Sequence, residues 1–482
     1  MNIVELIRKE TLAFQYKTAL IQCNDKILYH EFFTKITQAA DELKKNSLKK
    51  GDRVGFLCED SIDYIIVCLA VLSLSAVIVP VPGSCSQAEI DDLVCRIDLN
   101  FFIFDKSEYS TESCGNESRI IFDGIAGTKK FRIYQRKANN NLPIEYYNLN
   151  PAFIRFTSGT TGDSKGVLLS HETIVQRTDA ANQALNVTSD DIIIWMLSMS
   201  FHFVVTILLF LRQGATIIIC SGSFPDSLRQ GLEKNRGTFI YASPFHYRMM
   251  IKSDLFPPAT FSCFRLAVST AMRLSVSTAD NFYKKFGLEL SQAYGLIEVG
   301  LPFINNSQNS ATRESTGKIL PDYMVKIVNP NQEGIGEISI KGKGIFDAYF
   351  SPWRSRSQVA PDGWFETGDL GRLDNDGFLF LVGRKKNIIN FTGMKIFPYE
   401  VESVINQYPG VKESLVYGNP HNIYGELPCA GIVLNNGHTE NFDLSELRKF
   451  CYQRLASYKV PKEFMLVKKL DKTASGKLKR KD

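Results

Sequence analysis

Short apolar segments that alternate with amphipathic segments constrain the fold of this chain more than any other feature of its sequence. The apolar segments are rich in β-branched and aromatic side chains, which is typical of buried strands. They include Arg53–Cys58, Ala76–Val79, Phe101–Phe104, Ala215–Cys220 and Phe264–Val268. Strands separated by helical segments predict layered α/β subdomains, and 44% apolar residues in a chain of 482 suffice for a large core.

Two uncharged stretches, Tyr64–Gly83 and Ile192–Leu211, are each about as long as a bilayer-spanning helix. The first contains Pro80 and Pro82, and the second has His202 near its centre. Neither has basic flanking loops or aromatic belts. We therefore expect a helix followed by a strand in the first stretch, and a strand, a loop and a helix in the second, without stable membrane insertion.

The charge, cysteine and histidine patterns exclude several classes of protein. Lys and Arg number 56 and Asp and Glu 51, a net charge of +5, which is too low for a dedicated nucleic-acid surface. The ten cysteines form no C-x-x-C pair and the six histidines no H-x-x-x-H, so neither a disulfide framework nor a zinc site is supported. With no signal-peptide pattern at the N-terminus, the sequence predicts a cytoplasmic protein with free thiols.

The chain divides into two domains by its composition. Short runs with several glycines between Val325 and Tyr349 predict a β-rich section of hairpins. After Gly383 the sequence becomes basic, with 14 Lys and Arg against 10 Asp and Glu between 387 and 482. Helical patterns follow at Pro398–Gln407 and Leu444–Leu455. We expect a large domain over 1–384 and a small mobile α+β domain over 385–482, joined by a short hinge.

The segment Phe156–Val167 has the composition of a phosphate-binding loop, because hydroxyl groups, glycines and one lysine follow a short strand-like run. Its candidate donors are Thr157, Ser158, Thr160, Thr161 and Lys165. It does not match G-x-x-x-x-G-K-[ST], since Lys165 is followed by Gly166, so the P-loop of kinases and GTPases is excluded.

This segment resembles T-S-G-T-T-G-x-x-K-G, the phosphate-loop signature of the adenylate-forming ANL superfamily, which contains acyl- and aryl-CoA synthetases, peptide-synthetase adenylation domains and luciferases. Further segments resemble that superfamily's motifs in the same order: Gln292–Glu298 (QAYGLIE), Gly363–Asp369 (GWFETGD), Gly383–Arg384, Thr392–Glu400 (TGMKIFPYE) and Lys472–Lys477 (KTASGK). The resemblance spans nearly the whole chain.

The resemblance implies roles for individual residues. The nucleotide would be bound by Thr157, Ser158, Gly159, Thr160, Thr161, Gly162, Lys165, Ser269, Thr270, Ala271, Tyr294, Gly295, Asp369 and Arg384. Glu298 would hold Mg²⁺ together with phosphate oxygens. Lys386 would be the hinge residue. Lys477 would be the catalytic lysine, because an ammonium between the substrate carboxylate and the α-phosphate offsets their repulsion.

The implied reaction has two steps. A carboxylate attacks ATP to give acyl-AMP and pyrophosphate, and a thiol then takes the acyl group and releases AMP. The thiol would enter a tunnel beside Thr392 and Gly393, and it would belong to CoA or, alternatively, to the phosphopantetheine of a carrier protein. A degenerate protein that binds nucleotide or acyl groups without turnover is a further alternative.

The segment Ser198–Val205 bears on which class of carboxylic acid is the substrate. Amino-acid-activating relatives place an Asp there to pair the α-ammonium, and this segment contains no acidic residue, so an α-amino acid is disfavoured. His202, Phe203 and Val205 would line the acyl pocket, and Val205 stands where the family usually has glycine. We expect a short-chain, medium-chain or aromatic acid.

Two departures bear on the rate of adenylation. Ile297 stands where the superfamily has a threonine that donates to the α-phosphate, and the S-G-G-A-P segment is replaced by Ser269–Arg273 (STAMR). Loss of one such hydrogen bond, worth about 1–3 kcal/mol, predicts an adenylation step slower by roughly tenfold to a hundredfold.

Overall fold

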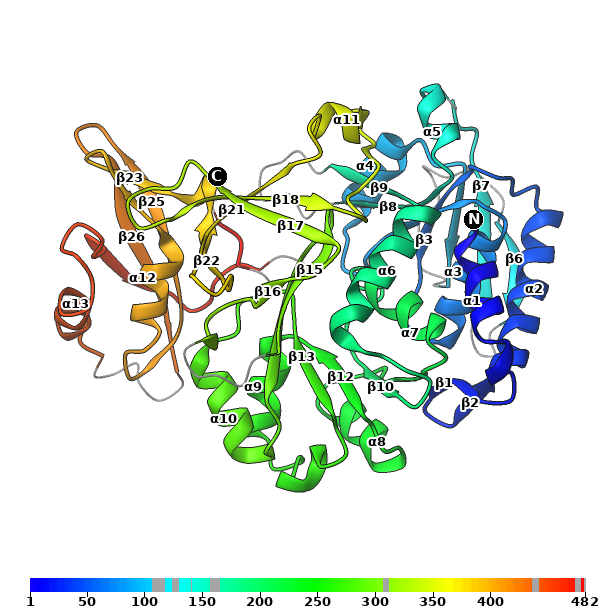
Figure 1. Ribbon diagram of the computed structural model, residues 1–482, viewed down its shortest axis with the longest axis horizontal. Helices are drawn as coiled ribbons and strands as arrows, with labels where there is room; N and C mark the ends of the chain where they lie inside the picture. Colours follow the sequence, from blue (N-terminus) through cyan, green and yellow to red (C-terminus); the bar gives the residue numbers. More distant parts are fainter. Residues whose placement is uncertain are drawn as a thin grey trace. The chain divides into compact units, whose positions relative to one another are not determined.

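The computed structural model describes residues 1–105, 118–123, 130–139, 141–156, 165–306, 312–435, 442–472 and 478–480, with 118–123 as backbone alone (Figure 1). These residues form two compact units. The first comprises the described residues within 1–156, 165–324 and 341–363, and the second those within 325–340 and 364–480.

The first unit contains two sheets, each with nine strands in the described residues. Across the first sheet the strands are β16 (Lys318–Ile319), β15 (Gly300–Asn305), β14 (Leu290–Leu296), β13 (Leu266–Ser269), β12 (Phe239–Ala242), β10 (Ile192–Trp195), β11 (Thr216–Ile219), β1 (Thr18–Gln22) and β2 (Asp25–Leu28). From β14 to β1 every neighbouring pair is parallel, so the carboxyl ends of these strands share one edge of the sheet.

The second sheet is also parallel at its centre. Its strands are β20 (Arg354–Ser355), β19 (Ala348–Tyr349), β9 (Gly166–Ser170), β8 (Pro151–Phe156), β4 (Val77–Pro80), β3 (Arg53–Leu57), β5 (Phe101–Phe104), β7 (Lys130–Gln135) and β6 (Ser118–Asp123). The strands β8, β4, β3 and β5 are parallel to one another. The α/β architecture predicted from the alternation of apolar and amphipathic segments is confirmed.

Two helices lie between these sheets. Helix α3 (Ile62–Ser73) packs on β4 of the second sheet and β1 of the first, and it is buried from Ile62 to Leu72. Helix α6 (His171–Leu185) packs on β9 and on β15 (Figure 1). Because both surfaces of α3 are covered, its sequence is apolar all round, which explains the uncharged stretch that begins at Tyr64.

The remaining helices of the first unit cover the outer faces of the sheets or connect strands. They are α1 (Ile3–Glu10), α2 (Tyr29–Lys45), α4 (Gln87–Ile97), α5 (Ile144–Asn148), α7 (Leu209–Arg212), α8 (Asp226–Lys234), α9 (Pro244–Lys252), α10 (Val276–Phe286) and α11 (Arg356–Val359). One apolar cluster joins α8, α9 and α10 to the first sheet through Leu228, Tyr247, Met250, Phe282 and Phe286.

Both uncharged stretches form buried α/β core, as predicted. The first is α3 followed by β4, and the second is β10, a loop, a π-helical turn at Val204–Leu208 and α7. Within the described residues, none of the helices combines the length and the apolar character that crossing a bilayer requires.

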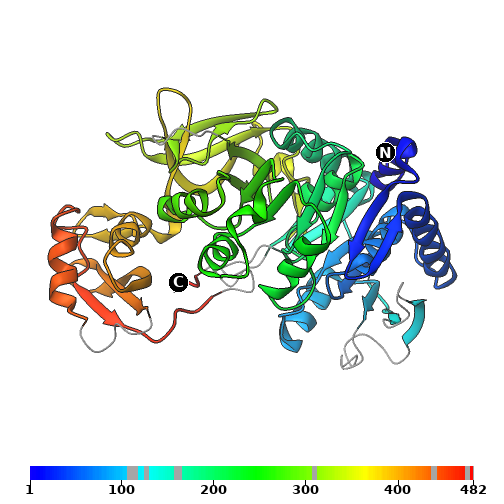
Figure 2. The same cartoon turned by 90° about the horizontal axis from the view of Figure 1, so that it is seen from below.

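The second unit contains two further sheets. The first has the order β17 (Tyr323–Val328), β18 (Gly336–Gly342), β21 (Phe365–Leu373) and β22 (Leu379–Arg384). The second consists of β24 (Met394–Ile396), β23 (Ile389–Phe391), β26 (Gly425–Leu434), β25 (Val411–His421) and β27 (Glu463–Leu466). Helices α12 (Pro398–Ile405) and α13 (Leu444–Tyr452) pack against this second sheet (Figure 1, Figure 2).

The β-rich section predicted over Val325–Tyr349 contains strands, but they do not all belong together. Strands β17 and β18 lie in the second unit, whereas β19 pairs with β9 of the first unit. By contacts, β21 and β22 group with the C-terminal residues. The boundary predicted after Arg384 marks where a mobile domain begins. The two units are defined by contacts and do not test movement, so this boundary stays a prediction.

A buried histidine at the start of α6 makes the stability of the first unit depend on pH. His171 accepts the backbone N–H of Ile3 at Nδ1 (3.2 Å), and its Nε2 is buried without a hydrogen-bond partner among the described residues. Burial lowers the pKa of His171 to about 4. In the unfolded chain the same histidine binds a proton with a pKa of about 6.5. The free energy of unfolding should therefore fall by up to about 3 kcal/mol as the pH drops from 6.5 to 4.

Chemical denaturation of the wild type and of His171→Asn between pH 7 and 4.5 measures this effect. The asparagine can still accept the Ile3 N–H but does not titrate. We expect the variant to lose less stability on acidification than the wild type. Equal pH slopes for the two proteins would show that His171 does not contribute.

Candidate functional site

Tyr349 connects two residues that the sequence placed in separate motifs. Glu298 lies in the turn between β14 and β15, and the Tyr349 hydroxyl donates a hydrogen bond to its Oε1 (3.3 Å). The Lys165 ammonium lies 4.9 Å from the centroid of the Tyr349 ring. This arrangement follows from the second sheet, in which β19 pairs with β9 and sets Tyr349 opposite Val167. The structure thus brings Lys165 and Glu298 to one place.

Tyr349 acts there as a neutral hydrogen-bond donor. Burial raises its pKa above the ordinary value of 10, and the neighbouring Glu298 carboxylate raises it further. A phenol with a raised pKa keeps its proton at neutral pH and holds the carboxylate that accepts it. Sequence reasoning missed Tyr349, because nothing in the segment around it indicates pairing with β9.

The backbone that carries Glu298 is held by a buried arginine of α6. Arg177 donates to the carbonyl oxygens of Ile297 (2.9 Å), Glu298 (2.8 Å) and Gly344 (2.6 Å). Its side chain is 3% exposed, and burial lowers its pKa to about 10, which leaves it charged at neutral pH. The Glu298 carbonyl also accepts the Phe346 N–H (2.7 Å). Sequence reasoning missed Arg177 as well, since a lone arginine in a helix carries no motif.

Ile297 has a fixed backbone but no hydroxyl, which makes its effect on rate testable. Because Arg177 holds the carbonyls of the turn, Ile297→Thr should place a hydroxyl without moving the main chain. We expect the variant to form acyl-AMP roughly tenfold to a hundredfold faster than the wild type, which corresponds to about 1–3 kcal/mol.

The measurement is acid-dependent pyrophosphate release without a thiol, and Ile297→Val serves as the control that has the shape of threonine but no hydroxyl. An unchanged or lower rate for Ile297→Thr would contradict the role assigned to the missing hydroxyl.

The carboxyl ends of β13 and β14 hold the other predicted nucleotide residues of the first unit. Ser269 and Gln292 are register partners, and Ser269 Oγ and Gln292 Oε1 are buried without hydrogen-bond partners among the described residues. Thr270 continues from β13 and donates its N–H to Ala242 (3.0 Å). Ala271 has φ of 69°, a left-handed conformation that favours glycine. This edge of the sheet therefore carries polar atoms that a ligand could satisfy.

Tyr294 and Gly295 lie further along β14. Tyr294 is buried, with its ring 6.0 Å from that of Phe303 on β15. At Gly295 a Cβ would lie 2.6 Å from the Gly300 carbonyl oxygen, so close approach of the two strands requires glycine. Strand packing therefore explains why a glycine stands at position 295. Its predicted contact with the nucleotide stays a prediction.

In the second unit, Asp369 and Arg384 are cross-strand partners on β21 and β22. Arg384 Nε lies 2.6 Å from Asp369 Oδ1, in an ion pair whose carboxylate is largely buried. Lys386 follows in a 3₁₀ turn over Lys385–Asn387, and Lys385 pairs with Glu337 (2.6 Å). The structure therefore brings the two predicted ribose or phosphate contacts together at the point where the predicted hinge begins.

Thr392 and Gly393 form the two-residue turn of the hairpin between β23 and β24. Their φ angles are 50° and 81°, and Phe391 pairs with Met394 across the turn. Two successive positive φ angles require glycine or a tolerant residue, so the turn itself accounts for Gly393. Its predicted contact with the thiol stays a prediction.

Several predicted site residues lie outside the described residues. They are Thr157, Ser158, Gly159, Thr160, Thr161, Gly162 and Lys477. Their roles rest on the sequence motifs alone.

The predicted acyl-pocket residues lie on the loop and π-helical turn after β10. His202 donates its backbone N–H to the Ser198 carbonyl (3.0 Å). Phe203 is 2% exposed and packs in the core against Tyr64 and Phe153, and Val205 departs from helical geometry within the π-helical turn. None of His202, Phe203 and Val205 is among the described residues that line the adjacent pocket.

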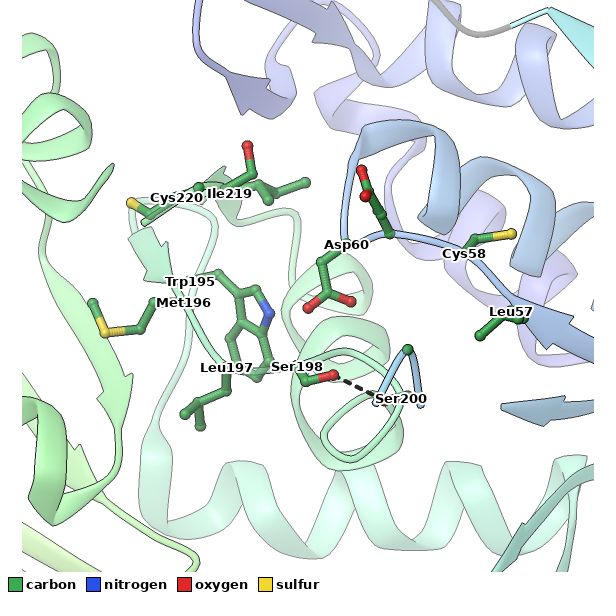
Figure 3. Close-up of a pocket in the computed structure, with 14 residues that line it drawn as sticks. Leu57, Cys58, Asp60, Trp195, Met196, Leu197, Ser198, Ser200, Ile219 and Cys220 are labelled. Carbon is green, nitrogen blue, oxygen red and sulfur yellow. Dashed lines mark hydrogen bonds between the residues drawn. The ribbon is translucent and has the colours of Figure 1, made fainter. Parts of the chain in front are cut away.

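That pocket has a volume of about 430 Å³ and lies at the carboxyl ends of β3, β4, β10 and β11 (Figure 3). Its walls come from Leu57–Asp60, Gly83, Trp195–Ser198, Ser200 and Ile219–Gly222. The structure places Asp60 beside the segment that lacks an acidic residue of its own, since Asp60 Oδ1 accepts the Met199 N–H (3.0 Å). This carboxylate comes from the loop after β3, far from Ser198–Val205 in the sequence.

Two family models of known enzymes match the sequence of this chain. The family model of the AMP-binding enzymes matches residues 8–350, and that of the AMP-binding enzyme C-terminal domain matches residues 400–477.

Relatives match nearly the whole length of the chain. The 2-succinylbenzoate–CoA ligase of Listeria monocytogenes is 28% identical over 472 residues, which are 96% of this chain and 95% of the relative. The mitochondrial medium-chain acyl-CoA ligase of Mus musculus is 25% identical over 512 residues, 95% and 82% of the two chains. The crystal structure of ATP-bound MatB from Rhodopseudomonas palustris has a TM-score of 0.86 and 25% identity, and the match covers 99% and 97% of the chains.

Proposed function

The chain belongs to the AMP-binding enzymes and is an AMP-forming acid–thiol ligase, and we propose that it joins a medium-chain or aromatic carboxylic acid to CoA with the help of Mg²⁺. The enzyme activates its acid with ATP through an acyl-AMP intermediate and then transfers the acyl group to a thiol. The observation in the structure that carries the proposal is the meeting of Lys165 and Glu298 at Tyr349.

The residues around Glu298 fit Mg²⁺ bound jointly with ATP. A hard cation needs oxygen ligands, and the Glu298 carboxylate offers them in a position held by Tyr349 and Arg177. Within the described residues no group of three or more His, Cys, Asp or Glu side chains gathers to hold a metal. Phosphate oxygens would therefore supply further ligands, and the bound ion would offset phosphate charge.

The nucleotide site proposed in the first unit draws on polar atoms that are otherwise unpartnered. Ser269 Oγ and Gln292 Oε1 are buried without partners among the described residues, and a nucleotide at the carboxyl ends of β13 and β14 would satisfy them. In the second unit, the Asp369 carboxylate could accept ribose hydroxyls while it remains paired with Arg384. Lys386 would be the hinge residue, and the mobile domain would begin at 385.

CoA is the proposed thiol, with the phosphopantetheine of a carrier protein as the alternative. The two relatives described above are CoA ligases. The basic C-terminal segment would attract the phosphates of CoA, and the Thr392–Gly393 turn would lie beside the thiol. The cysteines that the structure describes are free thiols. Thiols stay free in a reducing compartment, which supports the proposal that the protein works in the cytoplasm.

Pyrophosphate release tests this function. The enzyme is incubated with ATP, Mg²⁺ and a panel of fatty, aromatic and amino acids, with and without CoA. We expect release with medium-chain or aromatic acids and stimulation by CoA. Release with amino acids alone would contradict the proposed acid, and release that a carrier protein stimulates but CoA does not would contradict the proposed thiol.

A further inference from the structure

A buried ion pair in the second unit holds residues 478–480 against α12. Arg480 Nη2 lies 2.8 Å from Glu402 Oε2, and the two side chains are only 9% and 7% exposed. Glu402 belongs to α12, and the Arg480 guanidinium also lies 4.6 Å from the centroid of the Tyr399 ring on the same helix. Removing one member of a buried ion pair is costly, so this pair gives residues 478–480 one preferred position.

The same two side chains bind the backbone of one residue in β25. Arg480 Nη1 donates to the Val416 carbonyl oxygen (2.9 Å), and Glu402 Oε1 accepts the Val416 N–H (2.8 Å). Among the described residues β25 is the last strand on its side of the sheet. The planar guanidinium thus contacts a carboxylate and a carbonyl at once, which a lysine ammonium on a flexible chain reproduces less well.

The backbone of this segment is also tied to residues 471 and 472. Leu478 forms an antiparallel bridge with Lys472, and the Lys479 N–H donates to the Asp471 carbonyl oxygen (2.8 Å). The Lys472 ammonium in turn lies 2.9 Å from Glu413 Oε2 on β25. The residues on both sides of 473–477 are therefore joined to each other and to β25.

Lys477 directly precedes Leu478, and it lies outside the described residues. Because consecutive Cα atoms are about 3.8 Å apart, the position of Leu478 limits where the Lys477 backbone can lie. The sequence motif predicts that Lys477 is the catalytic lysine. A shift of about 1 Å in the position of a reacting group can cost about a hundredfold in rate, so a fixed backbone next to Lys477 has a consequence for catalysis.

We propose that Arg480, held by Glu402, is a positioning residue for Lys477 in the formation of acyl-AMP. The inference rests on the proposed acid–CoA ligase function and on the role that the motif assigns to Lys477. Arg480 acts through the backbone that it fixes, since its guanidinium is engaged by Glu402 and Val416. Loss of the pair should therefore slow the step that needs Lys477 and spare thioester formation, which does not.

Three variants of the full-length protein test this role. Arg480→Met removes the charge and the hydrogen bonds but keeps a long side chain. Arg480→Lys keeps a charge that can pair with Glu402. The matched control is Lys459→Met, because Lys459 pairs with Glu400 of the same helix (2.7 Å) and takes no part in fixing residues 478–480.

The measurements are pyrophosphate release with acid and ATP, AMP release from supplied acyl-AMP with CoA, and hydrogen exchange at the Lys479 amide. In Arg480→Met we expect kcat for acyl-AMP formation to fall about thirtyfold, with KM for ATP and acid and the rate of AMP release within about twofold of the wild type. The Lys479 amide should exchange about tenfold faster. Arg480→Lys should recover much of the lost rate, and Lys459→Met should retain both half-reactions.

A double variant shows whether Arg480 acts through Lys477. If it does, Arg480→Met combined with Lys477→Ala should form acyl-AMP no more slowly than Lys477→Ala alone, because residues that act as one unit are not additive. If Arg480→Met does not fold, Glu402→Gln takes its place with the same expected results, since its amide oxygen can still accept the Val416 N–H.

Four results would overturn the inference: equal losses in both half-reactions, a loss confined to KM, a further additive loss in the double variant, or faster Lys479 exchange with an unchanged kcat. The last would show that Arg480 fixes the segment without affecting Lys477. If the wild type releases no pyrophosphate with any acid, the ligase function fails and the inference fails with it. An active wild type and an equally active Arg480→Met would overturn the inference alone.

Discussion

Lys477→Ala is expected to lower acyl-AMP formation by at least about a hundredfold, while thioester formation from preformed acyl-AMP stays within a few fold of the wild type. In the first step two anions, the substrate carboxylate and the α-phosphate, must approach each other. An ammonium between them offsets this repulsion and stabilises the charge that develops during phosphoryl transfer. The second step has no such approach, since the acyl group is already activated.

Two assays on the same preparation separate these steps: pyrophosphate release with acid and ATP, and AMP release from supplied acyl-AMP with CoA. Lys479→Ala is the matched control, because Lys479 is an exposed lysine two residues along the same segment. Equal losses in both assays for Lys477→Ala would contradict its role in the first step, and so would an equal loss of acyl-AMP formation in Lys479→Ala.

Arg177→Met is expected to destabilise the fold and to raise the Mg²⁺ concentration that the enzyme requires. The substitution leaves the carbonyls of Ile297, Glu298 and Gly344 without their buried donor, which should cost about 3 kcal/mol of unfolding free energy. The turn that carries Glu298 then loses its support. We expect the Mg²⁺ concentration for half-maximal pyrophosphate release to rise about tenfold, with a lower maximal rate.

Arg212→Met separates these two effects. Arg212 is also a buried arginine that contacts α6, through Thr178 and Asp179, and within the described residues none of its hydrogen bonds reaches the Glu298 turn. It should lose comparable stability and keep its Mg²⁺ dependence. Both variants are assayed at a temperature where denaturation curves show them folded. A wild-type Mg²⁺ dependence in Arg177→Met would show that Arg177 only stabilises the fold.

Much of the fold could be predicted because its signals are local. The strands at Arg53–Leu57, Val77–Pro80 and Phe101–Phe104 appear as short apolar runs, since each is buried in the middle of a parallel sheet. The same reasoning identified the uncharged stretch at Tyr64 as a helix and a strand. By contrast, the partner of the two-residue strand β19 could not be predicted, because its pairing with β9 depends on a contact between segments far apart in the chain.

The candidate site was predictable to the same extent. Lys165, Glu298, Asp369 and Arg384 lie in motifs whose residues are adjacent in sequence, so the motifs identified them. Tyr349, Arg177 and Asp60 have no motif, and they reach the site from other strands, helices and loops. The segment Ser198–Val205 contains no acidic residue, but Asp60, from the loop after β3, lies beside it in space.

By itself, the sequence determined the α/β class and the adenylate-forming chemistry, and it predicted which residues carry charge or donors to ATP, because each of these depends on patterns within short segments. Only the tertiary structure decided what holds those residues and which side chains line the adjacent pocket. The orientation of the Asp60 carboxylate, of a buried indole N–H without a partner among the described residues, or of an arginine on a backbone carbonyl results from packing between distant segments, which no local pattern encodes.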